Sequence, residues 1–172
     1  MTSLSRVAPR DTGTHAAPLR LGDRFPFSRW APIPLRLMVG FGFMQHGFAK
    51  LHRGPEVFAS ILQALNVPAP HLAAWGTILV EIFGGLAVLL GAYVALASVP
   101  MAAVLLTAIF TVHFHYGFAS IKLVGVTSAG VQFGKPGYET GLLYLACLVA
   151  LLLAGPGPFA VDNLRKGMKP AQ

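Results

Sequence analysis

Charged side chains are scarce in this chain. Only 11% of its 172 residues are Asp, Glu, Lys or Arg, and 55% are hydrophobic, whereas soluble domains carry roughly 25% charged residues. No Lys or Arg occurs between Arg53 and Lys122. This shortage argues against a soluble domain and predicts an integral membrane protein.

Cysteine is rarer still, because Cys147 is the only one and lies within an apolar run. The chain therefore cannot form an internal disulfide or a CxxC pair, and it cannot perform dithiol–disulfide exchange alone. It also has no HExxH motif and no Cys cluster, so no metal site is predicted. A Gly-rich nucleotide motif and Ser-His-Asp spacing are missing as well.

The net charge of +7 comes mainly from basic residues near the two ends. Because no aromatic–basic interleaving accompanies them, we expect no nucleic-acid partner. The start of the chain lacks the apolar h-region of a secretory signal. We expect a flexible basic tail over residues 1–31, a membrane domain over 32–158 and a second tail over 159–172, with both tails cytoplasmic.

Four apolar segments qualify, or nearly qualify, as transmembrane helices of about 20 residues. They are Ile33–Leu51, Leu72–Gly91, Val94–Phe118 and Glu139–Ala154. The predicted fold is therefore an all-α integral membrane protein built as a four-transmembrane-helix bundle.

Two shorter segments connect these helices. Pro55–Asn66 places Phe58, Ile61 and Leu62 at helical spacing and is too short to span, which predicts a short amphipathic helix at the interface. The Gly-rich stretch Ala119–Tyr138 is expected to be a loop over the outer ends of the helices.

Orientation follows from Lys and Arg near the helix ends. Five basic residues precede the first helix and three follow the last, which makes eight, against Arg53, Lys122 and Lys135 in the two longer loops. This bias predicts a multi-pass protein of the bacterial inner membrane with both termini in the cytoplasm.

Glu81 is the only acid in an apolar stretch that runs, with short interruptions, from about Leu72 to Phe118. An ionisable residue inside a membrane is the default place to look for function. At about 1.5 Å per residue, His46 on the first helix lies at nearly the same depth. We therefore predict His46 and Glu81 as catalytic residues.

Further polar residues gather in the outer half of the predicted bundle or share the face of His46, and we predict that they bind a cofactor. On the first helix Arg36, His46 and Lys50 fall within about 80° at ~100° per residue. Gly40 and Gly47 lie on nearly the same face as this group and would let another helix approach closely. The predicted cofactor-binding residues are Arg36, Lys50, His113, His115 and Glu139.

Each of these residues also has a purely structural interpretation. Glu81 could join two helices, Lys50 could anchor at the interface, and Arg36 could extend to anionic lipid. His113 and His115 are about 200° apart on a regular helix, so they cannot both face one site unless the helix is broken. Glu139 could favour the start of its helix through the helix dipole.

The segments PLRLMVGFGFMQHGFAKL, PEVFASILQALNVPAP and VEIFGGLAVLLGAY, in this order, resemble the DoxX family, as does the closing GYETGLLYLACLVALLLAGPGPFAVDNL. The resemblance covers about Pro34 to Leu164 and implies a four-helix inner-membrane protein. The family takes its name from a membrane subunit of an archaeal thiosulfate:quinone oxidoreductase. The resemblance assigns no catalytic role to any residue.

Three functional hypotheses follow. The leading one is a DoxX-like membrane subunit of a quinone-linked redox system, with sulfur or thiosulfate as one candidate substrate. Quinone is the expected cofactor, and a redox subunit or a second copy is the expected protein partner. The second is a non-catalytic membrane anchor or assembly subunit for a redox partner. The third is a b-type haem-binding subunit, with haem held by His46 and either His113 or His115.

Overall fold

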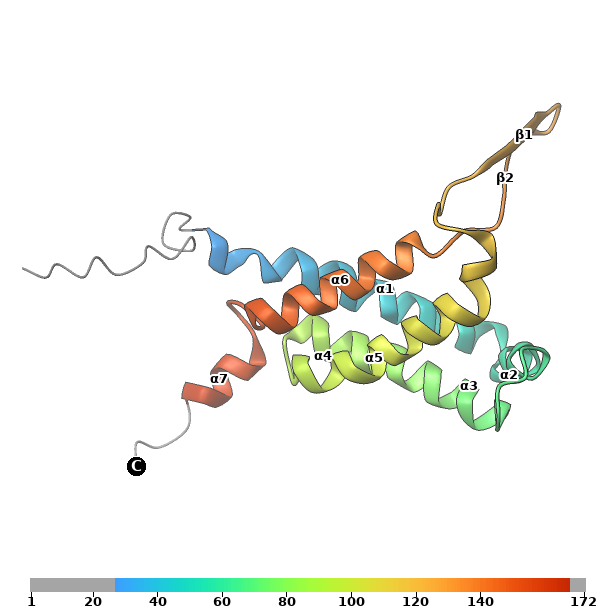
Figure 1. The fold of residues 1–172 in the computed structure, drawn as a ribbon. Helices are drawn as coiled ribbons and strands as arrows, with labels where there is room; N and C mark the ends of the chain where they lie inside the picture. The colour runs from blue at the N-terminus through green and yellow to red at the C-terminus, as the bar shows by residue number, and fades with distance from the viewer. Residues whose placement is uncertain (1–26, 168–172) are drawn as a thin grey trace, which may run out of the picture.

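The computed structural model describes residues 27–167. Four long helices lie along one another and form an elongated bundle, with the two ends of the described chain at the same end of it (Figure 1). Residues 1–26, most of the predicted basic tail, lie outside the described range. The predicted bundle of helices is therefore present, and shorter helices and a hairpin are attached at its two ends.

The helices follow the predicted segments closely. They are α1 (Pro32–Arg53), α2 (Pro55–Ala64), α3 (Pro70–Leu79), α4 (Gly85–Leu90), α5 (Val94–Ala108), α6 (Glu139–Ala154) and α7 (Val161–Gly167). Proline begins α1, α2 and α3, where its missing N–H is of no consequence. The short helix α2 confirms the predicted amphipathic segment between the first two long helices.

Two of the long helices contain a π-helical turn. Val80–Gly84 joins α3 to α4, so that one continuous helix runs over Pro70–Leu90. Ile109–His113 continues α5, and a 3₁₀ turn, Phe114–Tyr116, then ends that helix. These two helices are long and apolar enough to cross a membrane, while α6 is shorter and equally apolar. Mid-helix π turns occur frequently at functional sites.

Helix α1 crosses α4 at a contact between backbones. A Cβ atom added to Gly40 would lie 2.7 Å from the Gly85 carbonyl oxygen, and one added to Gly85 would lie 2.7 Å from that of Gly40. No other residue type fits at either position without moving a helix. This contact confirms the prediction that the glycine face of the first helix admits a close neighbour.

Arg36 connects α1 to two other segments at the end of the bundle where the described chain begins and ends. Its guanidinium donates to the carbonyl oxygens of Val88 and Leu89 at the end of α4 and of Pro156 and Pro158 after α6, at 2.9–3.2 Å. Only 6% of Arg36 is exposed. The expectation that Arg36 extends to lipid is therefore wrong, because its donors bind backbone carbonyl oxygens of two separate segments inside the protein.

Residues after α6 also pack on this end. The Asp162 carboxylate of α7 accepts hydrogen bonds from the backbone N–H groups of Tyr93 (2.8 Å) and Val94 (3.3 Å). These groups lie at the start of α5, so Asp162 caps the helix from a distant segment. The described part of the predicted C-terminal tail is thus a helix that is held against the bundle.

The segment Ala119–Tyr138 departs from the all-α prediction. It contains an antiparallel hairpin, β1 (Leu123–Thr127) and β2 (Gly130–Phe133), that projects from the end of the bundle opposite α7 (Figure 1). The expectation of a plain loop is wrong here. A β-bulge between Leu123 and Gly125 breaks the alternation by which a strand is recognised in a sequence.

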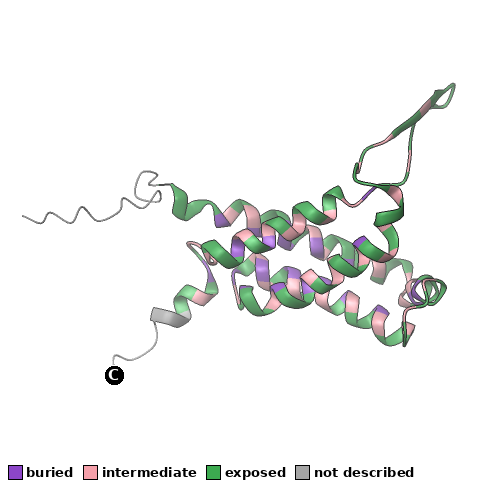
Figure 2. Cartoon of the chain, in the orientation of Figure 1, coloured by how far each residue is buried: buried purple, intermediate pink, exposed green. Residues whose placement is uncertain are grey.

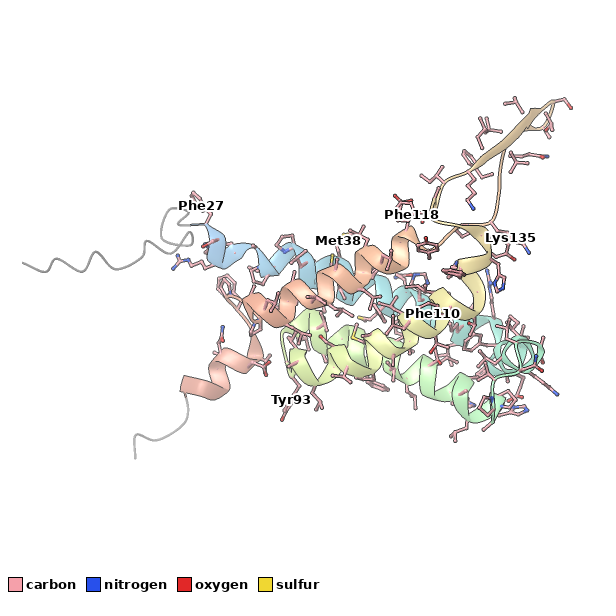
Figure 3. The ribbon with its side chains drawn as sticks, viewed as in Figure 1. Phe27, Met38, Tyr93, Phe110, Phe118 and Lys135 are labelled. Atoms are coloured by element: carbon pink, nitrogen blue, oxygen red, sulfur yellow. The ribbon has the colours of Figure 1, made fainter. Side chains whose placement is uncertain are left out.

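The interior is small and the exterior of the helices is apolar. Val39, Phe43, Val88, Met101 and Leu148 form the centre of the core. Figure 2 shows most of the buried residues where the helices face one another. Large apolar side chains point outward along the bundle, including the labelled Met38 and Phe110 in Figure 3. Exposed apolar surface of this extent is rare on soluble monomers.

The glycine crossing generates a stability prediction. Replacing Gly85 with Val should lower the free energy of unfolding in detergent by at least about 1–3 kcal/mol, because the new side chain meets the α1 backbone. Reversible unfolding by a denaturing detergent measures it. Gly76→Ala is the matched control, since Gly76 has open space around its Cβ position and a helical Gly-to-Ala change stabilises by about 1 kcal/mol. Equal effects of the two changes would contradict the close crossing.

Candidate functional site

The site centres on an ion pair between α1 and the π turn that follows α3. The Lys50 ammonium lies 2.5 Å from both carboxylate oxygens of Glu81. Only 6% of the Glu81 side chain is exposed, compared with 24% for Lys50. A buried carboxylate with a hydrogen-bonded cation satisfies the requirement for a charge removed from water. Of the two residues, Lys50 is the one that reaches the protein surface.

Local backbone geometry places Glu81 at this position. It lies in the π turn Val80–Gly84, and its neighbour Ile82 packs on Gly47 of α1, where an added Cβ would lie 2.7 Å from an Ile82 side-chain carbon. The missing side chain at Gly47 lets the π turn approach α1 closely. Lys50 follows three residues later on α1 and is therefore on the same side of the helix.

The amphipathic helix α2 supplies an aromatic wall. The Lys50 ammonium lies 5.2 Å from the centroid of the Phe58 ring, which is a cation–π distance. Helix α2 is held in place by a second small core in which Ala59 and Leu62 pack against Ala74 of α3. Lys50 is therefore in contact with a carboxylate from one element and an aromatic ring from another.

His46 lies one turn before Lys50 on α1, within electrostatic range of Glu81. His46 is exposed on the surface of α1. Lys50, which sequence reasoning assigned to cofactor binding, is thus the direct partner of Glu81, and His46 is the second, surface-facing neighbour. The structure brings together His46, Lys50 and Glu81.

The remaining predicted site residues have other partners. Arg36 lies near the opposite end of α1, about 21 Å away from Lys50 at 1.5 Å per residue. A ring nitrogen of His113 lies 3.1 Å from the Pro136 carbonyl oxygen, and the Glu139 carboxylate accepts from the Ser120 N–H at 2.8 Å. His115 is exposed in the 3₁₀ turn that ends the third long helix. The helix is indeed irregular around the two histidines.

Phe58 is the site residue that sequence reasoning did not select. It was identified as part of the apolar face of α2, and nothing in its spacing indicates that a lysine lies over its ring. Among the described side chains, no group of three or more His, Cys, Asp or Glu could hold a metal ion. The site can therefore hold a proton, donate hydrogen bonds from Lys50 and His46, and present an aromatic ring.

Comparison with known proteins gives one match. The DoxX family model matches residues 31–114, a range that contains α1 to α5 and with them His46, Lys50, Phe58 and Glu81. No curated protein and no solved structure matches the chain.

The ion pair generates a prediction that a double-mutant cycle can test. Lys50→Met or Glu81→Leu alone should each destabilise the protein, at the lower end of the roughly 3–5 kcal/mol for breaking a buried pair, because each leaves its partner's charge uncompensated. The double variant should be much less destabilised than the sum of the single changes. Unfolding in mixed micelles measures all of the variants.

An exposed pair serves as the control. Glu56 and His71 lie 2.9 Å apart with most of both side chains in contact with solvent. Glu56→Gln should change the free energy of unfolding by less than about 1 kcal/mol. Additive effects at Lys50 and Glu81 would show that the two side chains are not coupled.

Proposed function

The chain belongs to the DoxX family, and from this premise we propose that it is the membrane subunit of a quinone-linked redox system, with quinone bound at His46, Lys50 and Glu81. The observation that carries the proposal is the buried Glu81 carboxylate in a π turn, paired with a lysine that is still partly exposed. Membrane ionisable residues that are costly to bury are retained for function.

The residues at this position fit a quinone headgroup. Its two carbonyl oxygens accept hydrogen bonds, and the ammonium of Lys50 has three N–H donors, while Glu81 has two oxygens. His46 provides a further ring N–H on the surface of α1. Phe58 presents a flat apolar face beside Lys50. A planar ring with polar edges would therefore find both donors and an aromatic contact.

In this proposal quinone supplies the two-electron, two-proton redox chemistry, and the protein residues handle orientation and protons. Lys50 and His46 bind and orient the ring. Glu81 holds Lys50 in position and can hold a proton on one carboxylate oxygen. The ring nitrogens of His46 can both donate and accept hydrogen bonds, and the residue is exposed, so it suits proton exchange with water. The chain has no evident electron carrier, so a redox partner subunit supplies or accepts the electrons.

We further propose that all four long helices span the bacterial inner membrane. Each exposes large apolar side chains to the outside, for example Met38 on α1, Phe83 in the π turn, Leu96 on α5 and Leu153 on α6. An even number of spans agrees with the two ends of the described chain lying at the same end of the bundle. The excess of Lys and Arg near the termini supports a cytoplasmic position for both.

The proposed topology predicts a labelling pattern. In a Cys147→Ala background, Ser128→Cys at the hairpin tip should react with a membrane-impermeant maleimide in intact spheroplasts. Gln172→Cys should react only after the membrane is permeabilised. The reverse pattern would invert the orientation, and labelling of both sites from outside would show that α6 does not cross the membrane.

Quinone binding is tested directly with the purified protein in nanodiscs. Glu81→Gln and His46→Ala should each raise the Kd for a short-chain ubiquinone analogue by about tenfold or more, because each removes a charged or polar group from the site. His71→Ala, which changes an exposed histidine outside the site, should leave the Kd unchanged. Unaltered affinity in both site variants, with unaltered melting temperatures, would refute the assignment.

One observation favours the alternative of a non-catalytic anchor or assembly subunit. Both oxygens of Glu81 already accept from Lys50, so the pair is satisfied within the chain and can join two helices on its own. Under this alternative a redox partner co-purifies in mild detergent and remains active with both site variants. A strong visible absorption band in the same preparation would instead identify a haem-binding subunit.

A further inference from the structure

The hairpin β1–β2 has one face that is entirely apolar. Phe133 pairs with Leu123, and Val131 pairs with Val126, while Gln132 pairs with Gly125 and Gly130 with Thr127. Directly paired residues lie on the same face of a two-stranded ribbon, and successive residues alternate. At the paired positions one face therefore carries Leu, Val, Val and Phe, and the other carries Gly, Thr and Gln. The unpaired Val124 lies beside Gly134 on the second face.

The β-bulge between Leu123 and Gly125 creates this separation. Without an extra residue, Leu123 and Val126 would point to opposite faces, because they are three positions apart. The bulge restores Leu123 to the face of Val126, opposite Phe133. The four apolar residues are 54–73% exposed, so nothing in the described chain covers them.

The base of the hairpin is fixed to the ends of two long helices. The N–H groups of Gly137, Tyr138 and Glu139 donate to the carbonyl oxygens of Ala119, Gly117 and Phe118 at 3.0–3.1 Å. The hairpin thus leaves the bundle where the apolar helices end, and it projects outward and to one side of the bundle (Figure 1). For a membrane protein this position is the boundary between lipid and water.

The apolar surface is continuous from the helix to the hairpin. Phe114, Phe118 and Ile121 are 56–80% exposed and connect the exterior of the third long helix to Leu123. The same segment, residues 120–138, contains Lys122 and Lys135 and no acid. The Lys135 ammonium lies 3.2 Å from the Tyr116 hydroxyl, close to the helix end. Apolar residues beside cations are the pattern by which interfacial segments bind anionic lipid.

We propose that the hairpin is a membrane-surface element, with Leu123, Val126, Val131 and Phe133 inserted among the acyl chains and Lys122 and Lys135 against anionic headgroups. Lipid is always present beside the helix ends, whereas a protein partner must arrive by diffusion. An isolated two-stranded hairpin is marginally stable in water, so burial of its apolar face in lipid also stabilises its pairing. This role is independent of the quinone site.

The two faces of the hairpin can be compared by site-directed spin labelling of the full chain in vesicles. In a Cys147→Ala background, Val126→Cys and Val131→Cys place the label on the apolar face. Thr127→Cys and Gln132→Cys place it on the opposite face and are the matched controls. Power saturation with oxygen, which concentrates in lipid, and with a water-soluble nickel chelate measures the environment of each label.

In phosphatidylglycerol-containing vesicles, we expect the ratio of oxygen to nickel accessibility to be several times higher at 126 and 131 than at 127 and 132. The contrast should decrease in pure phosphatidylcholine and in a Lys122→Gln/Lys135→Gln variant. Equal nickel accessibility on both faces would overturn the proposal. Protection of 126 and 131 from both probes, with spin–spin broadening that disappears on dilution with unlabelled protein, would assign the face to a second copy and also overturn it.

Discussion

The contact between Gly40 and Gly85 determines how the rest of the bundle is arranged. It sets α1 and the second long helix at backbone distance and fixes their relative register. One turn toward the N-terminus of α1, this register places Arg36 beside the end of α4. Toward the other end it places Gly47 beside the π turn and Lys50 beside Glu81. A shift of either helix by one turn would separate both polar groups from their partners at once.

The π turn that carries Glu81 lets the second long helix pack against two different neighbours. An extra residue in the turn changes which side of the helix the following residues occupy. Gly84 consequently packs against Met101 of α5, and Gly85 packs against Gly40 of α1. One helix therefore has small residues toward two different neighbours, and the acid lies at the junction. The pair of Lys50 and Glu81 is thus embedded in a rigid seam, while His46 remains at its edge.

Sequence reasoning predicted the helices well and their partners poorly. A run of apolar residues was sufficient to locate α6 at Glu139–Ala154. Depth along a helix correctly brought Glu81 near His46, yet it could not show that the longer Lys50 side chain reaches the carboxylate. Arg36 was misjudged because its carbonyl partners are 52–122 positions away. The hairpin was missed because its bulge and glycines remove the alternation typical of a strand.

The hydrogen bonds of Arg36 can form only in the order in which their acceptors are synthesised. Arg36 lies on α1, which leaves the ribosome before the other described long helices. Two of its four hydrogen bonds go to carbonyls that follow 120 and 122 residues later. Until the last long helix and its Gly-Pro ending are synthesised, the guanidinium is only half paired inside an apolar environment. Completion of the chain relieves that deficit. The arginine therefore links the stability of α1 to the synthesis of the segment after α6, so that a chain truncated before Pro156 leaves part of the guanidinium without its acceptors.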